Sequence, residues 1–532
     1  MSLPVRVLVV LVAAIGFLFD TYELLMFPVI GADAVSELLK VPVDSDPVRL
    51  WIGRMLWIAA LSGGICGLLG GYFIDRFGRK TVMVASILMY SFSPVCAAFS
   101  SSLAMLVFFR CTTFIGVCVE MVAAVTWLAE LFETKRSREL AIGWSLAAAS
   151  LGGILVTAVY QYLVVYLKNP DAPILNLPLP MMARGDNLAW RYTLLTGLIP
   201  GLLILVLLPF VPESKVWKER KLAGTLKRPS FSELFAPDLI RTTLVTTVLS
   251  ACGYAAAFGA LQMTPSQMVP GLPAVSTDFK KGRADIAASQ KAVNAALEKQ
   301  KESIEAFEKA GIPVPTPEKP APANDANAEK LKELIANRTA AEAALKQAEK
   351  TLGEARKAFL PTAQKVKEYR GNIQLWQELG GLLGRILLAV FLIFIPSRTL
   401  LQLFLVPGVV LLPLTYYYFY QQPYFVFAIA VFLCGLLTVA QFSFMSEFLP
   451  KVFPLHLRGT GGSFASNVGG RMLGTMAAIV NTELLAPRFS GDNPSNVAMA
   501  AAIIGGSVFL IAFAFSFFLP VPRTEEAKPS SD

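Results

Sequence analysis

Charge and histidine are both scarce in this chain. Charged residues fill 16% of its 532 positions, against about 25% in soluble proteins. The only histidine is His456, which argues against a histidine proton relay or a His-rich metal site. Neither a catalytic constellation nor a phosphate-binding loop stands out. We therefore expect no enzyme, no cofactor and no bound metal.

Disulfide bonds are not expected from the positions of the cysteines. All the cysteines lie in apolar stretches, where cysteine behaves as a small hydrophobic residue, so no disulfide framework is expected. The net charge of +9 would suit a nucleic-acid partner. Basic cytoplasmic loops of a membrane protein explain this charge better, so no nucleic-acid partner is expected.

Long apolar runs dominate the rest, and the mean hydropathy is +0.56. A membrane helix needs ~20 apolar residues to cross ~30 Å of hydrocarbon. The first run holds Asp20 and Glu23 and lacks the basic start and cleavage site of a signal peptide, so it is interpreted as a retained helix. We predict an all-α membrane protein with twelve transmembrane helices, near residues 7–30, 50–73, 81–100, 103–130, 139–166, 191–211, 239–263, 375–395, 399–417, 423–445, 460–484 and 497–520.

Basic residues concentrate in alternate loops, such as "DRFGRK", "ETKRSRE" and "ESKVWKERKLAGTLKR". The positive-inside rule then places these loops and both termini in the cytoplasm. We expect a multi-pass protein of the plasma membrane, in contact with lipid, with the bacterial inner membrane as the favoured location.

The two parts of the chain resemble one another. Span 4 is followed by Glu130 and Arg138, and span 10 is followed by Glu447 and Arg458. Two repeated six-helix halves are typical of secondary transporters, whose substrate site lies between the halves. The predicted division is 1–212 for the first half, 213–238 for a cytoplasmic linker, 239–265 for span 7, 266–374 for an insert, 375–522 for spans 8 to 12 and 523–532 for a cytoplasmic tail.

The insert 266–374 is polar and rich in Ala, Lys and Glu. Leu345, Leu352 and Phe359 recur every seven residues, which is a heptad pattern. The proline-rich segment "GIPVPTPEKPAPANDAN" interrupts the helical pattern. We predict an antiparallel coiled-coil hairpin outside the cytoplasm, between spans 7 and 8, which offers a surface for a protein partner there. The alternative is a disordered linker.

The stretch "GGYFIDRFGRK" follows span 2. It resembles the loop signature G-x-x-x-D-R-x-G-R-[RK] of the major facilitator superfamily, which predicts that fold. "RCTTFIGVCVEMVAAVTWLAELF" and "VPESKVW" resemble the sugar porters and metabolite:proton symporters of that superfamily. The resemblance implies a cytoplasmic gate, for which the alternative is a topology anchor. The gate residues would be Gly71, Asp75, Arg76, Gly78, Arg79, Lys80, Glu130, Arg138, Glu447 and Arg458.

Charged residues inside the membrane are costly and usually functional. The resemblance to proton-coupled sugar porters implies that Asp20 in span 1 pairs with Arg110 in span 4 and exchanges a proton. The alternative is a static ion pair. Glu120, also in span 4, is expected either to bind substrate or a second proton, or to be a satisfied packing residue.

A lone arginine, Arg471, lies near the middle of span 11. Guanidinium groups bind carboxylates in bidentate fashion, so Arg471 suits an anionic substrate. The alternative is a pairing with Glu23 or Glu120. Further polar candidates for the substrate site are Glu23, Gln441, Asn467, Gln262 and Tyr160.

These features predict a secondary active transporter. The leading hypothesis is proton-coupled symport of a small polar metabolite, an organic acid or a sugar, by alternating access. An efflux antiporter or an uncoupled facilitator is the alternative. A third hypothesis, of another class, is a membrane-anchored scaffold or sensor that works through the hairpin.

Overall fold

The computed structural model describes residues 3–132, 135–167, 188–207, 210, 212–223, 231–310, 312, 328–454 and 457–520. Every regular element among these residues is helical. Their contacts divide the chain into two compact units. One unit comprises Met1–Pro273 with Lys367–Asp532 and is called the bundle below. The other, Ala274–Val366, is called the hairpin unit.

The first part of the bundle, called the N-half, begins with five long helices and continues with shorter ones. They are α1 (Leu3–Leu39), α2 (Asp46–Phe77), α3 (Arg79–Ala98), α4 (Leu103–Leu131), α5 (Lys135–Tyr166), α6 (Leu188–Leu195) and α7 (Leu198–Leu207), followed by the linking helices α8 (Lys215–Leu222) and η3 (Phe231–Phe235).

The second part, called the C-half, starts at α9 (Ile240–Ala256), with η4 (Ala257–Leu261), η5 (Thr264–Met268) and η6 (Val269–Gly271). After the hairpin helices α10 (Pro273–Lys309) and α11 (Ala328–Phe391) come α12 (Ser397–Tyr417), η8 (Phe419–Gln421), α13 (Tyr424–Val452), α14 (Arg458–Phe464), η9 (Ala465–Leu473), η10 (Gly474–Met476), α15 (Ala477–Ile479), η11 (Val480–Leu485), η12 (Ala486–Arg488) and α16 (Asn493–Ser516).

Eight helices of the described chain are long and apolar enough to cross a membrane. They match eight of the predicted spans and cover Pro4–Leu39, Asp46–Gly70, Arg79–Ala98, Leu103–Leu128, Ile240–Gly271, Ser397–Gln421, Tyr424–Leu449 and Asn493–Ser516. The other four predicted spans fall on α5, on the α6–α7 pair, on the end of α11 and on the short helices from α14 to η11. Helices suit a bilayer because they satisfy their backbone polar groups internally.

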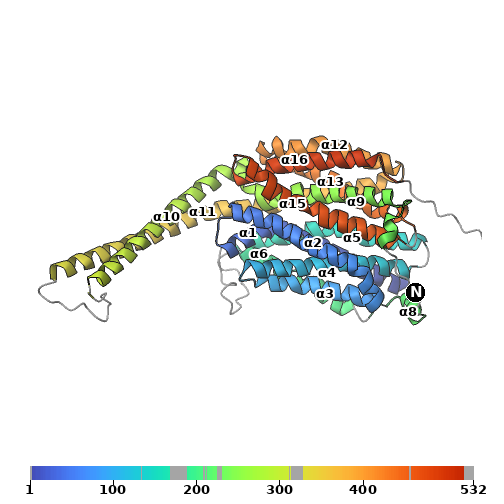
Figure 1. Ribbon diagram of the computed structural model, residues 1–532, viewed down its shortest axis with the longest axis horizontal. Coiled ribbons are helices and arrows are strands. Elements are labelled where there is room, and N and C mark those ends of the chain that lie inside the picture. The colour runs from blue at the N-terminus through green and yellow to red at the C-terminus, as the bar shows by residue number, and fades with distance from the viewer. Residues whose placement is uncertain are drawn as a thin grey trace, which may run out of the picture. The chain divides into compact units, whose positions relative to one another are not determined.

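Figure 1 shows the bundle helices running side by side, with the blue N-half helices and the green-to-red C-half helices gathered on opposite sides. Within the N-half, α1 packs on α5, and α4 packs on α2 and α3. Within the C-half, α12 packs on α16 and α9 packs on η9. The halves meet where α2 contacts η9 and α1 contacts η5. The two ends of the bundle are named below after the α1–α2 loop and the α2–α3 loop.

Several bundle helices are irregular near the contact between the halves. Pro28 lies inside α1, where it cannot donate a backbone hydrogen bond. The segments η4, η5, η9 and η11 are π-helical, with wider turns than an α-helix. Such segments are frequent at functional sites, and η9 carries Asn467 and Arg471.

The hairpin unit pairs α10 with the first part of α11. The rings of Phe279 and Phe359 lie 5.4 Å apart. The Lys365 ammonium donates to the carbonyl of Ala274. Contacts therefore join the start of α10 to the C-terminal end of the α11 segment in this unit, which is an antiparallel arrangement. Leu352, one of the predicted heptad positions, is buried, as are Val293 and Phe307 of α10, whereas Leu297 and Ile304 of α10 are exposed.

Candidate functional site: buried charges between the two halves

Arg110 lies buried on α4 and bonds to the backbone of α1. Its Nη1 donates to the carbonyl of Glu23 at 2.8 Å and its Nη2 to the carbonyl of Leu24 at 3.0 Å. Leu24 precedes Pro28 by four residues, so its carbonyl lacks the usual helical donor. Arg110 thus supplies the Leu24 carbonyl with the hydrogen-bond donor that Pro28 lacks.

This arrangement differs from the predicted pairing of Asp20 with Arg110. The guanidinium of Arg110 bonds to carbonyl oxygens and lies 4.7 Å and 5.2 Å from the ring centres of Phe114 and Phe27. The carboxyl group that acts electrostatically on this guanidinium is that of Glu23. The sequence-based pairing of Asp20 with Arg110 rested on the spans in which the two residues lie. Pro28 was the sequence feature that could have pointed to the observed bonds, because a proline leaves a backbone carbonyl of α1 in need of a donor.

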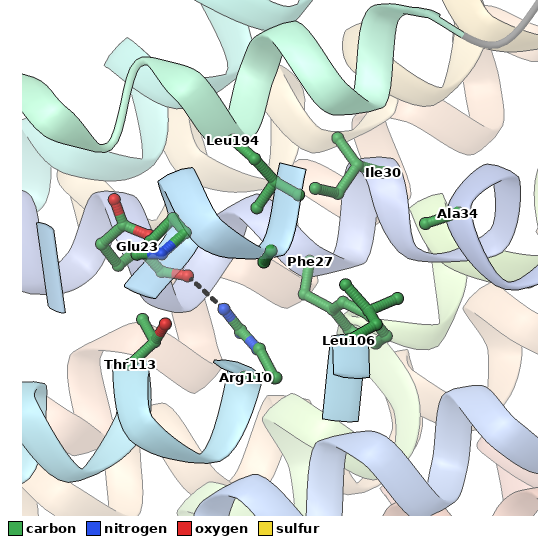
Figure 2. Close-up of a pocket in the computed structure, with 10 residues that line it drawn as sticks. Glu23, Phe27, Ile30, Ala34, Leu106, Arg110, Thr113 and Leu194 are labelled. Atoms are coloured by element: carbon green, nitrogen blue, oxygen red, sulfur yellow. Dashed lines mark hydrogen bonds between the residues drawn. The ribbon is translucent and has the colours of Figure 1, made fainter. Parts of the chain in front are cut away.

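Glu23 borders a small cavity inside the N-half. Figure 2 shows Arg110 bonded to the Glu23 carbonyl, with Phe27, Leu106 and Leu194 around the space. The cavity measures about 20 Å³, enough for about one water molecule, so it is too small for a sugar or an organic acid. Both carboxylate oxygens of Glu23 are buried without a hydrogen-bond partner.

Asp20 lies beside Glu120 of α4, the second buried acid of that region. The two carboxyl groups interact electrostatically, and Asp20 and Glu120 are 8% and 0% exposed. Gly16, one turn before Asp20, makes room for Glu120, because a Cβ there would lie 2.5 Å from Glu120 Oε1. Apart from this interaction with Asp20, both Glu120 oxygens are buried without a hydrogen-bond partner. Asp20 and Glu120 therefore form an acidic pair on the α1–α4 contact.

Arg471 reaches this pair from the C-half. Its Nη1 donates to Asn467 Oδ1 at 2.6 Å and its Nη2 to the sulfur of Met121 at 3.3 Å. Met121 belongs to α4, and Asp20 lies within electrostatic range of the guanidinium. The alternative partners predicted for Arg471 were Glu23 and Glu120, whereas the carboxylate that acts electrostatically on its guanidinium is that of Asp20, alongside the side chains of Cys118 and Tyr254. Asn467 orients Arg471 and so acts with it.

The remaining polar candidates lie elsewhere in the bundle. Gln441 on α13 is buried near Gly253 of α9. Gln262, just after η4, is buried with its Oε1 unpaired. Tyr160 on α5 interacts with Asp33 and Arg370 rather than with the acidic pair. Of the predicted site residues with described side chains, Asp20, Glu120, Arg471 and Asn467 are the ones linked to one another by the interactions above.

Bonds between the halves gather toward the α1–α2 end. Arg370 of α11 forms a 3.0 Å ion pair with Asp33 of α1. Gln161 of α5 donates to Asn372 at 2.5 Å. Further bonds here join Arg49 to Asn493 at 2.8 Å, Arg54 to Glu483 at 2.6 Å and Trp57 to the Met472 carbonyl at 3.1 Å. This end is closed. None of Asp33, Arg370 and Asn372 was singled out from the sequence, because an ion pair between distant helices leaves no local pattern.

At the α2–α3 end, the loop signature packs onto its own half. Gly78 has φ +99°, a backbone conformation that favours glycine. Arg79 pairs with Glu130 of α4 at 2.8 Å. The backbone amide of Lys80 donates to the carboxylate of Glu213, which belongs to the "PES" motif. These contacts join α2, α3, α4 and the start of α8.

The other predicted gate residues either form side-chain bonds within their own helix or have side chains outside the described ones. Arg76 donates to the Tyr72 hydroxyl at 2.8 Å, and Glu447 pairs with Lys451 one turn along α13. The side chains of Asp75, Arg138 and Arg458 are not among the described ones, nor are the surroundings of Gly71. The contact of Asp75 with the opposite half therefore stays a prediction.

The helices, their apolar surfaces and the buried charges define a multi-pass membrane protein. Residues 10–281, about half of the chain, match the family model described as Major Facilitator Superfamily. The chain belongs to this family, which confirms the resemblance found in its loop signature.

Several membrane transporters are similar in sequence to part of this chain. The chain is 24% identical over 251 residues to a probable 4-methylmuconolactone transporter of Cupriavidus pinatubonensis, covering 47% of this chain and 53% of that protein. It is 28% identical over 247 residues to a cis,cis-muconate transport protein of Acinetobacter baylyi, covering 44% and 53%. The chain thus spans about half the length of these curated relatives.

The fold is shared with solved transporters. A crystal structure of a D-xylose–proton symporter superimposes with a TM-score of 0.59 at 16% identity, covering 96% of this chain and 98% of that one. The inward-open xylose transporter of E. coli gives a TM-score of 0.57, covering 97% and 96%. At these identities the likeness concerns the fold alone.

Proposed function

We propose that the protein is a proton-coupled symporter of a small organic acid. The observation that carries this proposal is the position of Arg471. A guanidinium of the C-half stands beside the Asp20–Glu120 pair of the N-half, where a carboxylate substrate competes with Asp20 for it.

Proton coupling follows from the same competition. Two carboxyl groups that share a buried site cannot both carry charge cheaply, so the Asp20–Glu120 pair takes up a proton when it loses a neighbouring cation. When the substrate carboxylate occupies Arg471, Asp20 loses its counter-ion and binds a proton. Binding of the acid and binding of the proton therefore support one another.

Transport proceeds by alternating access, with the two halves moving around this site. The closed α1–α2 end is the outer face and the basic α2–α3 end faces the cytoplasm, in an inner membrane. The proposed arrangement has twelve membrane helices and a coiled-coil hairpin outside. The bonds from Arg110 to the backbone at Glu23 and Leu24 hold α1 in place next to Pro28 and so position Asp20.

The relatives support the choice of substrate class. Their printed names include transporters of cis,cis-muconate, niacin and sialic acid, all of which are carboxylic acids. Another relative is an arabinose–proton symporter, which agrees with proton coupling. Sugars are therefore the alternative substrate class against which organic acids are tested.

Reconstituted proteoliposomes test the proposal. Acid-dependent proton uptake is measured with a pH-sensitive dye for cis,cis-muconate, nicotinate and D-xylose. Asp20→Asn should abolish proton uptake while exchange of labelled acid across the membrane continues. The control is Glu342→Gln, which removes a half-exposed carboxylate of the hairpin unit. Uptake of D-xylose but of neither acid would refute the substrate class, and acid uptake without protons would refute the coupling.

A further inference from the structure

A second polar group lies on α11, apart from the charges around Arg471. Glu378 Oε1 accepts hydrogen bonds from Gln374 Nε2 at 2.7 Å and from Gln377 Nε2 at 3.3 Å. Gln374 and Gln377 are 0% and 1% exposed, and Glu378 is 8% exposed. Three polar side chains are thus buried within little more than one helical turn.

This group is short of hydrogen-bond donors. Both glutamines direct their NH₂ groups to Glu378, so their own Oε1 atoms are left buried without a partner. The charged group that acts on Glu378 is Arg385, two turns further along the same helix. Buried acceptors without donors are unfavourable, so a ligand that supplies donors is favoured here.

The group faces the contact between the two halves. Gly153 of α5 stands against it, because a Cβ at that position would lie 2.6 Å from Glu378 Cδ and 2.7 Å from Leu25 Cδ1. A larger residue at 153 would therefore displace the carboxylate. Gly153 and Leu25, which meet at this position of α5 and α1, carry no charge.

Access to this group depends on the state of the bundle. The Gln161–Asn372 bond and the Asp33–Arg370 ion pair join the halves within about two turns of Glu378 on α11, toward the α1–α2 end. Once these contacts break, α5 and α11 separate and Glu378 faces the opening. The group is thus placed where a solute entering from that end meets it.

We propose that Glu378, Gln374 and Gln377 form a subsite for hydroxyl groups of the transported solute. The inference rests on the proposed function and narrows it, because the substrate would be a hydroxylated organic acid rather than an unsubstituted one. Its hydroxyls donate to the carboxylate and the two amide oxygens of α11. A site built to accept hydrogen bonds rejects an analogue that lacks the donors.

Matched pairs of acids test this subsite. The pairs are cyclohexanecarboxylate with quinate, hexanoate with gluconate and benzoate with 3,4,5-trihydroxybenzoate, which differ only in hydroxyl groups. Dissociation constants are measured by calorimetry on the purified full-length protein. For at least one pair, we expect the hydroxylated acid to bind at least tenfold more tightly to the unaltered protein, and Glu378→Gln to reduce this ratio to below threefold.

Controls separate the subsite from general damage. Glu342→Gln removes another carboxylate of α11, in the hairpin unit, and should leave the ratio unchanged. Gln374→Met keeps the side-chain volume and removes one acceptor, so it replaces Glu378→Gln if that variant does not fold. Equal binding within every pair overturns the subsite and leaves the proposed function standing. Binding of none of the six acids overturns the proposed function and the subsite with it.

Discussion

The Asp33–Arg370 ion pair should hold the α1–α2 end of the bundle closed. The two side chains meet at 3.0 Å and are 9% and 1% exposed. Arg370 also donates to the carbonyl of Val29 at 3.3 Å. Asp33→Asn keeps the shape but leaves the Arg370 guanidinium buried without its counter-ion.

The size of the effect follows from that burial. Removing one partner of a buried ion pair costs about 3–5 kcal/mol. Each 1.4 kcal/mol changes an equilibrium tenfold, so the closed state should lose roughly 100- to several-thousand-fold in its equilibrium with the open state. Only the state in which the pair forms is affected, because Arg370 regains water when the halves separate.

Spin labels at Pro47 and Ser490 measure this equilibrium, in a protein whose native cysteines have been replaced. Pro47 lies in the first turn of α2 in the N-half, and Ser490 lies just before α16 in the C-half. Asp33→Asn should shift the distance distribution from a short to a long population.

The control is Glu37→Gln, which breaks the 2.6 Å Glu37–Arg191 ion pair inside the N-half on the same helix. It should leave the distribution unchanged. An unchanged distribution in Asp33→Asn, or an equal shift in Glu37→Gln, would refute the assignment of the Asp33–Arg370 pair to closure.

Two further predictions concern stability, measured by unfolding of the purified protein in detergent. Arg110→Leu removes the donors from the Glu23 and Leu24 carbonyls, which should cost roughly 1–3 kcal/mol per group. Adding Pro28→Ala restores a backbone donor near Leu24, so the double variant should be more stable than Arg110→Leu alone; no recovery would contradict the role given to Arg110. Gly78→Ala forces alanine to φ +99° against Glu213 and Trp217, which should destabilise by about 1–3 kcal/mol. Gly353→Ala is its control, because a Cβ there meets nothing within 4 Å, and a similar loss in both variants would count against strain at Gly78.

Much of the fold could be predicted from the sequence. Apolar runs of membrane-spanning length and the loop signature around Gly78 predicted an all-helical membrane protein of this family, which the structure and the comparisons confirm. Eight of the predicted spans meet the length and composition of membrane helices. The other four contain polar residues or helix breaks, such as the break at Gly197 between α6 and α7. A hydropathy average over a long window does not detect such interruptions.

The candidate site was only partly predictable. Asp20, Glu120 and Arg471 stand out because charge is rare in apolar runs. Their partners do not, since a pairing depends on which helix faces lie together. Arg110 was matched to Asp20 for this reason, although Pro28 redirects it to the backbone of α1. Glu378 falls inside the predicted span 375–395 but only three residues from its start, where a charged residue is ordinary, so it was not singled out.

The sequence by itself determined the helical membrane fold, its family and the small set of charges that enter the bundle. Local chemistry suffices for these, because hydropathy, helix length and a glycine at positive φ are properties of neighbouring residues. Only the tertiary structure decided that Arg471 meets the acids of the other half, that Asp33 and Arg370 close one end, and that Glu378 lies against Gly153. Each of these contacts joins residues more than two hundred positions apart, and it arises from the packing of one half on the other.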